Sequence, residues 1–182
     1  TYSVTDAQGN LSSLDRIVKV VDTKKPGIYL KGVRIANNQV IKLQIGSVFL
    51  DEVYSDDYCN GSIATVKTPG FNGVVNTLIR ATYEVTYNAQ DPSGNKADED
   101  GYLVIYRVDD YILPEISLNT SDTVIHDVNT PYNPQEVSVF DNYYETKDIS
   151  ISKLGLVNPY KLGVYSEKYT AIDGSGNEGV KT

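Results

Sequence analysis

Acidic side chains gather where the chain is expected to turn, and the chemistry that such side chains suggest is the binding of a hard cation. Calcium takes its oxygen ligands from carboxylates, asparagine side chains and backbone carbonyls. The candidate ligands lie in one loop-rich stretch and at two expected domain junctions: Asp22, Asp51, Asp56, Asp57, Asp109 and Asp110. Their spacing matches no EF-hand loop, so calcium is one of two interpretations of these acids.

The other interpretation is turn chemistry, and three strings of one form favour it. They read DAQGN from Asp6, DPSGN from Asp91 and DGSGN from Asp173. Asp and Asn side chains bond to their own backbone in turns, and glycine adopts a positive φ without strain. We therefore interpret these strings as turns and keep calcium as a hypothesis for the junction acids.

Residues for catalysis are scarce. His126 is the only histidine and Cys59 the only cysteine, and we expect them in different domains. No nucleophile elbow, phosphate-binding glycine loop or zinc ligand set is present. We expect no enzymatic activity. A single cysteine excludes an intrachain disulfide, and we expect Cys59 to be a buried small hydrophobe rather than a thiol that joins chains.

Two further sets of residues could serve recognition. The N-x-S/T pattern of N-glycosylation occurs at Asn10, Asn60 and Asn119. Aromatic side chains expected in loops could form a patch that binds sugar or protein, or could instead anchor those loops: Tyr54, Tyr58, Tyr143 and Tyr144.

The composition limits the partners of the chain. Its 182 residues carry a net charge of −8, which disfavours nucleic acid because DNA affinity comes from Lys and Arg on phosphates. No stretch approaches the length of a membrane-spanning helix, so we expect no membrane insertion in this segment. Tyrosine occurs 15 times, and tyrosine suits a pleated, half-buried sheet.

A repeat organises the chain. The three turn strings lie 85 and 82 residues apart, and the prolines of VVDTKKPGIYL and RVDDYILPEISL, Pro26 and Pro114, lie 88 apart. Two landmarks with one period indicate a repeated domain. We expect residues 1–21 to be the C-terminal hairpin of a preceding domain, 22–108 to be a complete domain, and 109–182 to be a domain that lacks its last strand.

Alternation with a period of two predicts strands on both sides of the second turn, at Tyr83–Ala89 and Tyr102–Val108. Further strands are expected at Ile17–Val21, Ile28–Leu30, Gly46–Leu50, Ser62–Val66, Ile116–Leu118, Glu136–Phe140 and Ile149–Ser152. No amphipathic helical window is present. Six or seven short strands in about 85 residues predict tandem all-β sandwiches of the immunoglobulin-like type.

The pattern Y-x-V-T-Y-x-A-x-D-x-x-G-N-x-A, followed by an apolar strand, V-x-D and a proline, resembles bacterial Ig-like surface repeats of the DUF5011 kind and is similar to hyalin-type repeats. The upstream stretch GSVFLDEVYSDDYCNGSI is also similar to that family, and VSVFDNYYETKDI matches it more loosely. The resemblance covers nearly the whole chain and implies an Ig-like fold. The V-x-D-x-x-x-P joint is similar to cadherin linkers, which implies calcium at the junctions.

The resemblance and the repeat together imply a structural role outside a cell. We expect a non-catalytic segment of an extracellular stalk, filament or adhesin, on a cell or virion surface, acting as a semi-rigid spacer. Its partners would be neighbouring Ig-like domains of the same chain, other copies in a filament, or a surface glycan or protein. The alternatives are an adhesive or glycan-binding module and accessory spacer domains of a secreted enzyme.

Overall fold

The chain is built from β-strands. The computed structural model describes all 182 residues, with fifteen strands in five sheets, one three-residue 3-10 turn, η1 (Thr146–Asp148), and no α-helix. The predicted all-β class is therefore confirmed. The structure contains no helix with the length and apolarity needed to cross a bilayer.

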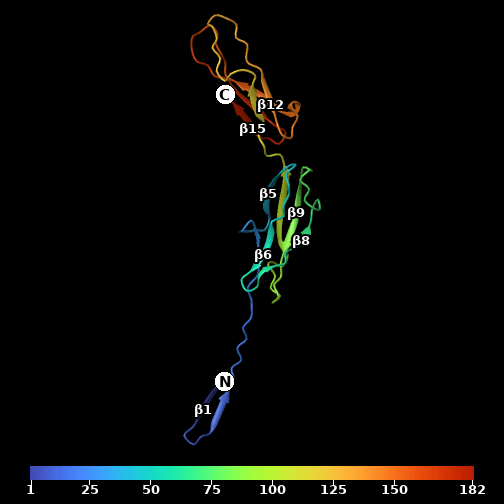
Figure 1. Cartoon of the computed structure of the whole chain (residues 1–182), viewed down its shortest axis with the longest axis vertical. Coiled ribbons are helices and arrows are strands. Elements are labelled where there is room, and N and C mark those ends of the chain that lie inside the picture. Colours follow the sequence, from blue (N-terminus) through green and yellow to red (C-terminus); the bar gives the residue numbers. More distant parts are fainter. The chain divides into compact units, whose positions relative to one another are not determined.

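The first sheet is a two-stranded hairpin, β1 (Tyr2–Thr5) with β2 (Leu11–Leu14), labelled at the blue end of Figure 1. Every residue of both strands is exposed. The prediction of a strand at Ile17–Val21 is wrong, because pairing runs directly out of the turn, from Thr5 opposite Leu11 to Tyr2 opposite Leu14. Residues 2–5 are therefore fully paired with Leu11–Leu14, and none of them is left to pair with residues 17–21.

A four-stranded antiparallel sheet carries Asp56 and Asp57 on one of its strands. Its order is β4 (Val33–Arg34), β3 (Gly27–Leu30), β6 (Val53–Asp57) and β7 (Gly61–Ile63). The predicted strand at Ile28–Leu30 is confirmed. The one predicted at Ser62–Val66 is broken, since Gly61–Ile63 and Val66–Pro69 belong to different sheets.

The other four-stranded sheet has the order β5 (Gln39–Gln44), β10 (Tyr102–Asp109), β9 (Ala81–Asn88) and β8 (Val66–Pro69) (Figure 1). Strand β9 shows the predicted alternation, with every second residue buried and its neighbours half-buried. The prediction of a strand at Gly46–Leu50 is wrong. The strand lies just before it, as β5, because Gly46 takes a φ of 77° and turns the chain.

The last part of the chain forms two small sheets. Strand β11 (Glu115–Leu118) pairs with β12 (Val137–Phe140), and β13 (Ser150–Leu154), β14 (Lys168–Ile172) and β15 (Glu178–Lys181) form the other. One buried apolar cluster joins them: Ile116, Val139, Ile149, Tyr169 and Ala171. The predicted strands at 116–118, 136–140 and 149–152 are confirmed within two residues.

Contacts between residues divide the chain into two compact units. One comprises residues 1–39, 51–68 and 86–103, and the other comprises 40–50, 69–85 and 104–182. Each unit holds one of the two acidic clusters described below. The boundaries at residues 22 and 109, and the tandem Ig-like arrangement, stay predictions.

Candidate metal centre

The three D-x-x-G-N strings form the same turn. In each, the Asp Oδ1 accepts the backbone N–H of the Asn four residues on, and the Asn Nδ2 donates to the Asp Oδ2 at 2.7 Å. The glycines take φ values between 85° and 93°, in the left-handed region. The hydrogen bond from Asn10 is the main reason that the pKa of Asp6 lies below its ordinary value. These hydrogen bonds agree with the interpretation of the strings as turns.

Two of these turns also hold the chain segment that precedes each proline. Asn95 Nδ2 donates to the carbonyl of Asp22 at 3.3 Å, and Asn177 Nδ2 donates to the carbonyl of Asp110 at 3.1 Å. Asp22 and Asp110 are equivalent positions, each four residues before the proline. The repeated asparagine therefore joins its turn to a junction.

Around the second junction, three carboxylates converge. Asp110, Asp141 and Asp173, hereafter the second acidic cluster, place one oxygen each within 4.8 Å of the others. Their residues are only 1%, 8% and 5% exposed. Asp110 follows β10, Asp141 follows β12 and Asp173 follows β14, so three strand ends supply the three groups.

Each of the first two carboxylates has one satisfied and one unsatisfied oxygen. Asp110 Oδ1 accepts from Gln44 Nε2 at 2.7 Å and from the Ile112 N–H at 3.2 Å, whereas Oδ2 is buried without a partner. Asp141 Oδ1 accepts the backbone N–H groups of Tyr143 and Tyr144, at 2.9 and 2.8 Å, and its Oδ2 is likewise buried without a partner. Buried anionic oxygens without partners cost free energy.

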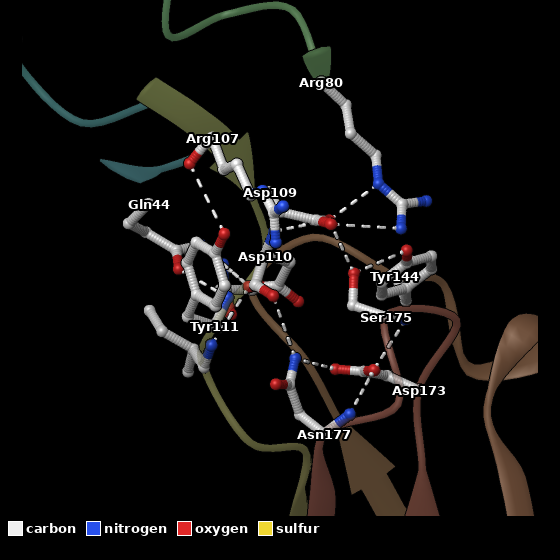
Figure 2. Close-up of polar contacts among 12 residues, drawn as sticks. Gln44, Arg80, Arg107, Asp109, Asp110, Tyr111, Tyr144, Asp173, Ser175 and Asn177 are labelled. Atoms are coloured by element: carbon white, nitrogen blue, oxygen red, sulfur yellow. Dashed lines mark hydrogen bonds and ion pairs between the residues drawn. The ribbon is translucent and has the colours of Figure 1, made fainter. Parts of the chain in front are cut away.

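Asp109 lies beside this cluster in the sequence, but its carboxylate binds Arg80 and Ser175 instead of joining the cluster. Its carboxylate accepts from Arg80 Nε at 2.6 Å and Nη2 at 3.3 Å, and from the Ser175 hydroxyl at 2.8 Å (Figure 2). Burial alone would raise the pKa of Asp109, but the hydrogen bonds from Ser175 and Arg80 outweigh it and lower the pKa. Asp109 already has its cation in Arg80.

The first acidic cluster comprises Asp22, Asp57 and Cys59. Here an amide lies between the carboxylates, since Asn60 Nδ2 donates to Asp57 Oδ1 at 2.9 Å and to Asp22 Oδ2 at 3.3 Å. The bond from Asn60 is the main cause that lowers the pKa of Asp57. Desolvation of the sulfur by neighbouring atoms, followed by the hydrogen bond to Asp22, raises the pKa of the Cys59 thiol, although the residue itself is exposed. The expectation that Cys59 is buried is wrong, because the turn after β6 leaves it exposed.

The remaining metal candidates join neither cluster. Asp51 forms an ion pair with Lys67 and accepts the Tyr87 hydroxyl at 3.1 Å. Asp56 lies exposed on β6. Both were placed in a loop-rich stretch by sequence, but the pairing of β6 with β3 puts Asp56 in a strand.

Sequence reasoning left Asp173 to its turn and did not assign it as a ligand. The repeat contained part of the signal, since a turn aspartate and an aspartate four residues before a proline recur together. That Asp173 meets Asp110 is seen only in the structure, and the turn aspartate Asp91 joins no such group with Asp22.

The glycosylation candidates are all exposed, but two of their amide nitrogens already make hydrogen bonds. Asn10 Nδ2 donates to Asp6, and Asn60 Nδ2 donates to Asp57. A glycan attached at either nitrogen would compete with those bonds. Asn119 uses only its oxygen, which accepts from the Ser138 hydroxyl.

The tyrosine candidates lie in different surroundings. Tyr54 was expected in a loop, and this is wrong, since it lies on β6 and stacks on Tyr29 at 5.5 Å between ring centroids. Tyr58 is 93% exposed. Tyr143 packs edge-to-face on Tyr144 at 5.0 Å, and the Tyr144 hydroxyl lies 3.0 Å from that of Ser175.

His126 lies in the long segment between β11 and β12. Its Nε2 lies 3.1 Å from the carbonyl oxygen of Thr130 and 3.0 Å from the hydroxyl oxygen of that residue, and its ring packs edge-to-face on Tyr132. His126 and Tyr132 line a hollow of about 490 Å³ whose other walls include Tyr165 and Glu167. Burial would raise the pKa of Glu167, but the bonds from Lys153 and Tyr132 outweigh it and lower the pKa.

Comparison with known proteins adds one similarity. No protein-family model matches the chain. The chain is 27% identical, over 188 aligned residues that include 97% of its length, to an uncharacterized 81.3 kDa protein of Acholeplasma phage L2. It spans 24% of that protein's length.

Proposed function

We propose that this chain is a non-catalytic structural segment of an extracellular stalk, filament or adhesin, in which tandem Ig-like β-sandwiches act as semi-rigid spacers. The all-β architecture in several small sheets supports the sandwich assignment. The similarity to a phage protein supports a virion surface among the possible locations.

The observation that carries the proposal is the bonding of three successive amides between β10 and Pro114. The N–H of Asp110 donates to Asp109 Oδ1 at 2.9 Å, that of Tyr111 to Gln44 Oε1 at 2.7 Å, and that of Ile112 to Asp110 Oδ1 at 3.2 Å. A flexible linker leaves its amides to water.

Side chains from both flanking parts of the sequence contact the same segment. Gln44 and Arg80 precede it, whereas Ser175 and Asn177 follow it (Figure 2). Because these four side chains converge on Asp109 and Asp110, bending the segment would break several hydrogen bonds at once.

Amide hydrogen exchange tests the proposal. We expect the N–H groups of Asp110, Tyr111 and Ile112 to exchange on the order of a hundredfold more slowly than in an unstructured peptide. Gln44→Ala should speed exchange at Tyr111 most, while Gln39→Ala, on the same strand, should leave it unchanged. Exchange at unprotected rates in the unsubstituted chain would contradict a semi-rigid spacer.

A binding module is the second candidate, and the exposure of Tyr58 together with the stacked pair of Tyr29 and Tyr54 favours it. Exposed aromatic rings supply large contact areas at low entropic cost. Glycan-array binding that Tyr54→Ala and Tyr58→Ala both abolish would support this candidate. Binding that survives both changes would assign recognition elsewhere.

A further inference from the structure

We propose that the second acidic cluster binds one calcium ion, with Asp110, Asp141 and Asp173 as its carboxylate ligands. The inference deepens the proposed spacer, because the ion would lie at the segment before Pro114. It stands on three observations: the convergence of the carboxylates, their burial, and the two oxygens without partners.

The geometry fits one ion. Calcium binds oxygen at 2.3–2.6 Å, so two ligands on opposite sides of the ion lie about 4.8 Å apart. The three ligand oxygens of the second acidic cluster all lie within 4.8 Å of one another. All three carboxylates therefore fit in one coordination sphere.

The electrostatics favour a bound cation. Three carboxylates that are at least nine-tenths buried lie within 4.8 Å of one another, and buried like charges at such a distance repel. No cationic side chain reaches them, because Arg80 pairs with Asp109 instead. A divalent cation bound to Asp110 Oδ2 and Asp141 Oδ2 would give both orphaned oxygens a partner.

The chemistry of the ligands selects a hard cation. The group contains oxygen donors only, with no histidine or cysteine, which favours calcium or magnesium over zinc or copper. Magnesium demands an almost ideal octahedron at about 2.1 Å and keeps several of its waters. A buried group of three carboxylates suits calcium better, because calcium accepts bidentate carboxylates and irregular geometry.

Calcium titration of the full chain tests the proposal, with thermal unfolding and terbium luminescence as readouts. Terbium substitutes for calcium, and the ring of Tyr144, whose amide donates to Asp141, would sensitise it. We expect the Tm to rise by about 5–10 °C when free calcium exceeds its dissociation constant a hundredfold. Magnesium at the same concentration should give a clearly smaller rise.

Asp141→Asn is the decisive variant. Asn keeps an oxygen for the two amides that Asp141 Oδ1 accepts, but it removes the charge. We expect the calcium-dependent rise in Tm and the terbium signal to disappear. In chelator, the variant should be at least as stable as the unsubstituted chain, because a buried like charge is gone. If this variant fails to fold, Asp110→Asn supplies the same test.

Two matched control variants each remove one negative charge outside the second acidic cluster. Asp148→Asn changes an exposed turn residue in the same part of the chain, and Asp57→Asn changes the residue of the first acidic cluster that is equivalent to Asp141. Both should keep the calcium response. A calcium-independent Tm with no saturable terbium signal would overturn the proposal, as would a response that survives Asp141→Asn. Protected amides at residues 110–112 would leave the spacer proposal standing in either case.

Discussion

Two members of each acidic cluster occupy equivalent positions in the repeat, Asp22 with Asp110 and Asp57 with Asp141, yet the clusters balance their charge differently. In the first acidic cluster, the Asn60 amide donates to both Asp22 and Asp57. In the second acidic cluster, the position equivalent to Asn60 is Tyr144, whose hydroxyl lies against Ser175 and not between the carboxylates. The difference is one bridging amide, because Asn142 Nδ2 donates to Asp110 Oδ1 alone, at 3.4 Å. Both clusters keep a buried carboxylate oxygen without a partner, at Asp57 in the first and at Asp110 and Asp141 in the second.

The junctions differ by one further residue. Asp109 immediately precedes the junction aspartate of the second cluster and pairs with Arg80, whereas Val21 holds the equivalent place at the first. Val21 is 56% exposed and offers no charge. The second junction thus has an ion pair beside its buried acids, and the first has an apolar side chain in water.

The largest expected effect is at Gly179, six residues after Asp173. A Cβ there would lie 1.9 Å from the Pro114 carbonyl oxygen, so Gly179→Ala must push β15 away from the junction. We expect a loss of about 3 kcal/mol in the free energy of unfolding. Ala97 holds the equivalent place after Asp91, and Ala97→Gly should cost only about 1 kcal/mol. Urea unfolding measures both, and equal losses would contradict a tighter second junction.

The turn asparagines give the next largest effect. Asn177→Ala and Asn95→Ala each remove the donor to a junction carbonyl and to the turn aspartate, and we expect each to cost about 1–2 kcal/mol. Asn10→Ala removes only an exposed bond within the turn and should cost less than about 0.5 kcal/mol. Thermal unfolding of the three variants tests this order. A cost at Asn10 equal to the others would mean that the junction bonds add nothing.

Much of this fold could be predicted from the sequence, because alternation reports burial directly. Strands β9 and β10 were predicted within two residues, since one face of each is apolar and buried. Strand β5 was missed in favour of Gly46–Leu50. A short apolar run has no period to fix its state, and the turn at Gly46 depends on bonds to distant residues, such as its N–H to the Thr77 carbonyl.

The candidate site was predictable only in part, for the same physical reason. The turn strings are local, and their side chains bond within five residues, so the sequence contains the whole motif. The second acidic cluster instead gathers the ends of three strands. Which carboxylates meet depends on packing between segments more than 30 residues apart, and residue spacing does not encode that packing.

The pair of Arg80 and Asp109 supplies a smaller, pH-dependent effect. Both side chains are partly exposed, so Asp109→Asn should cost about 0.5–1 kcal/mol at neutral pH. The folded pKa of Asp109 is lowered, so its contribution is complete above the unfolded value near 4 and is lost as the pH falls through the folded pKa. Unfolding of both proteins from pH 7 to 2 should therefore show their difference shrinking in acid.

The matched change at the first junction is Val21→Asp. It recreates the acid without an arginine partner and should alter the stability by less than about 0.5 kcal/mol. Stabilisation by Val21→Asp, or a difference for Asp109→Asn that stays constant in acid, would show that the ion pair does not distinguish the junctions.

The smallest effect concerns the thiol of the first acidic cluster. Desolvation of the sulfur by neighbouring atoms and, after it, the hydrogen bond and charge of Asp22 raise the pKa of Cys59, so less thiolate is present at pH 8 than for a free cysteine. Asp22→Asn removes that charge, and we expect the iodoacetamide reaction at pH 8 to become about twofold faster. Asp148→Asn, a distant charge change, should leave the rate unaltered. If Asp22→Asn leaves the iodoacetamide rate unchanged, the Asp22 carboxylate lies too far from the Cys59 sulfur to share a site with it. The first acidic cluster would then consist only of the amide-bridged pair of Asp22 and Asp57.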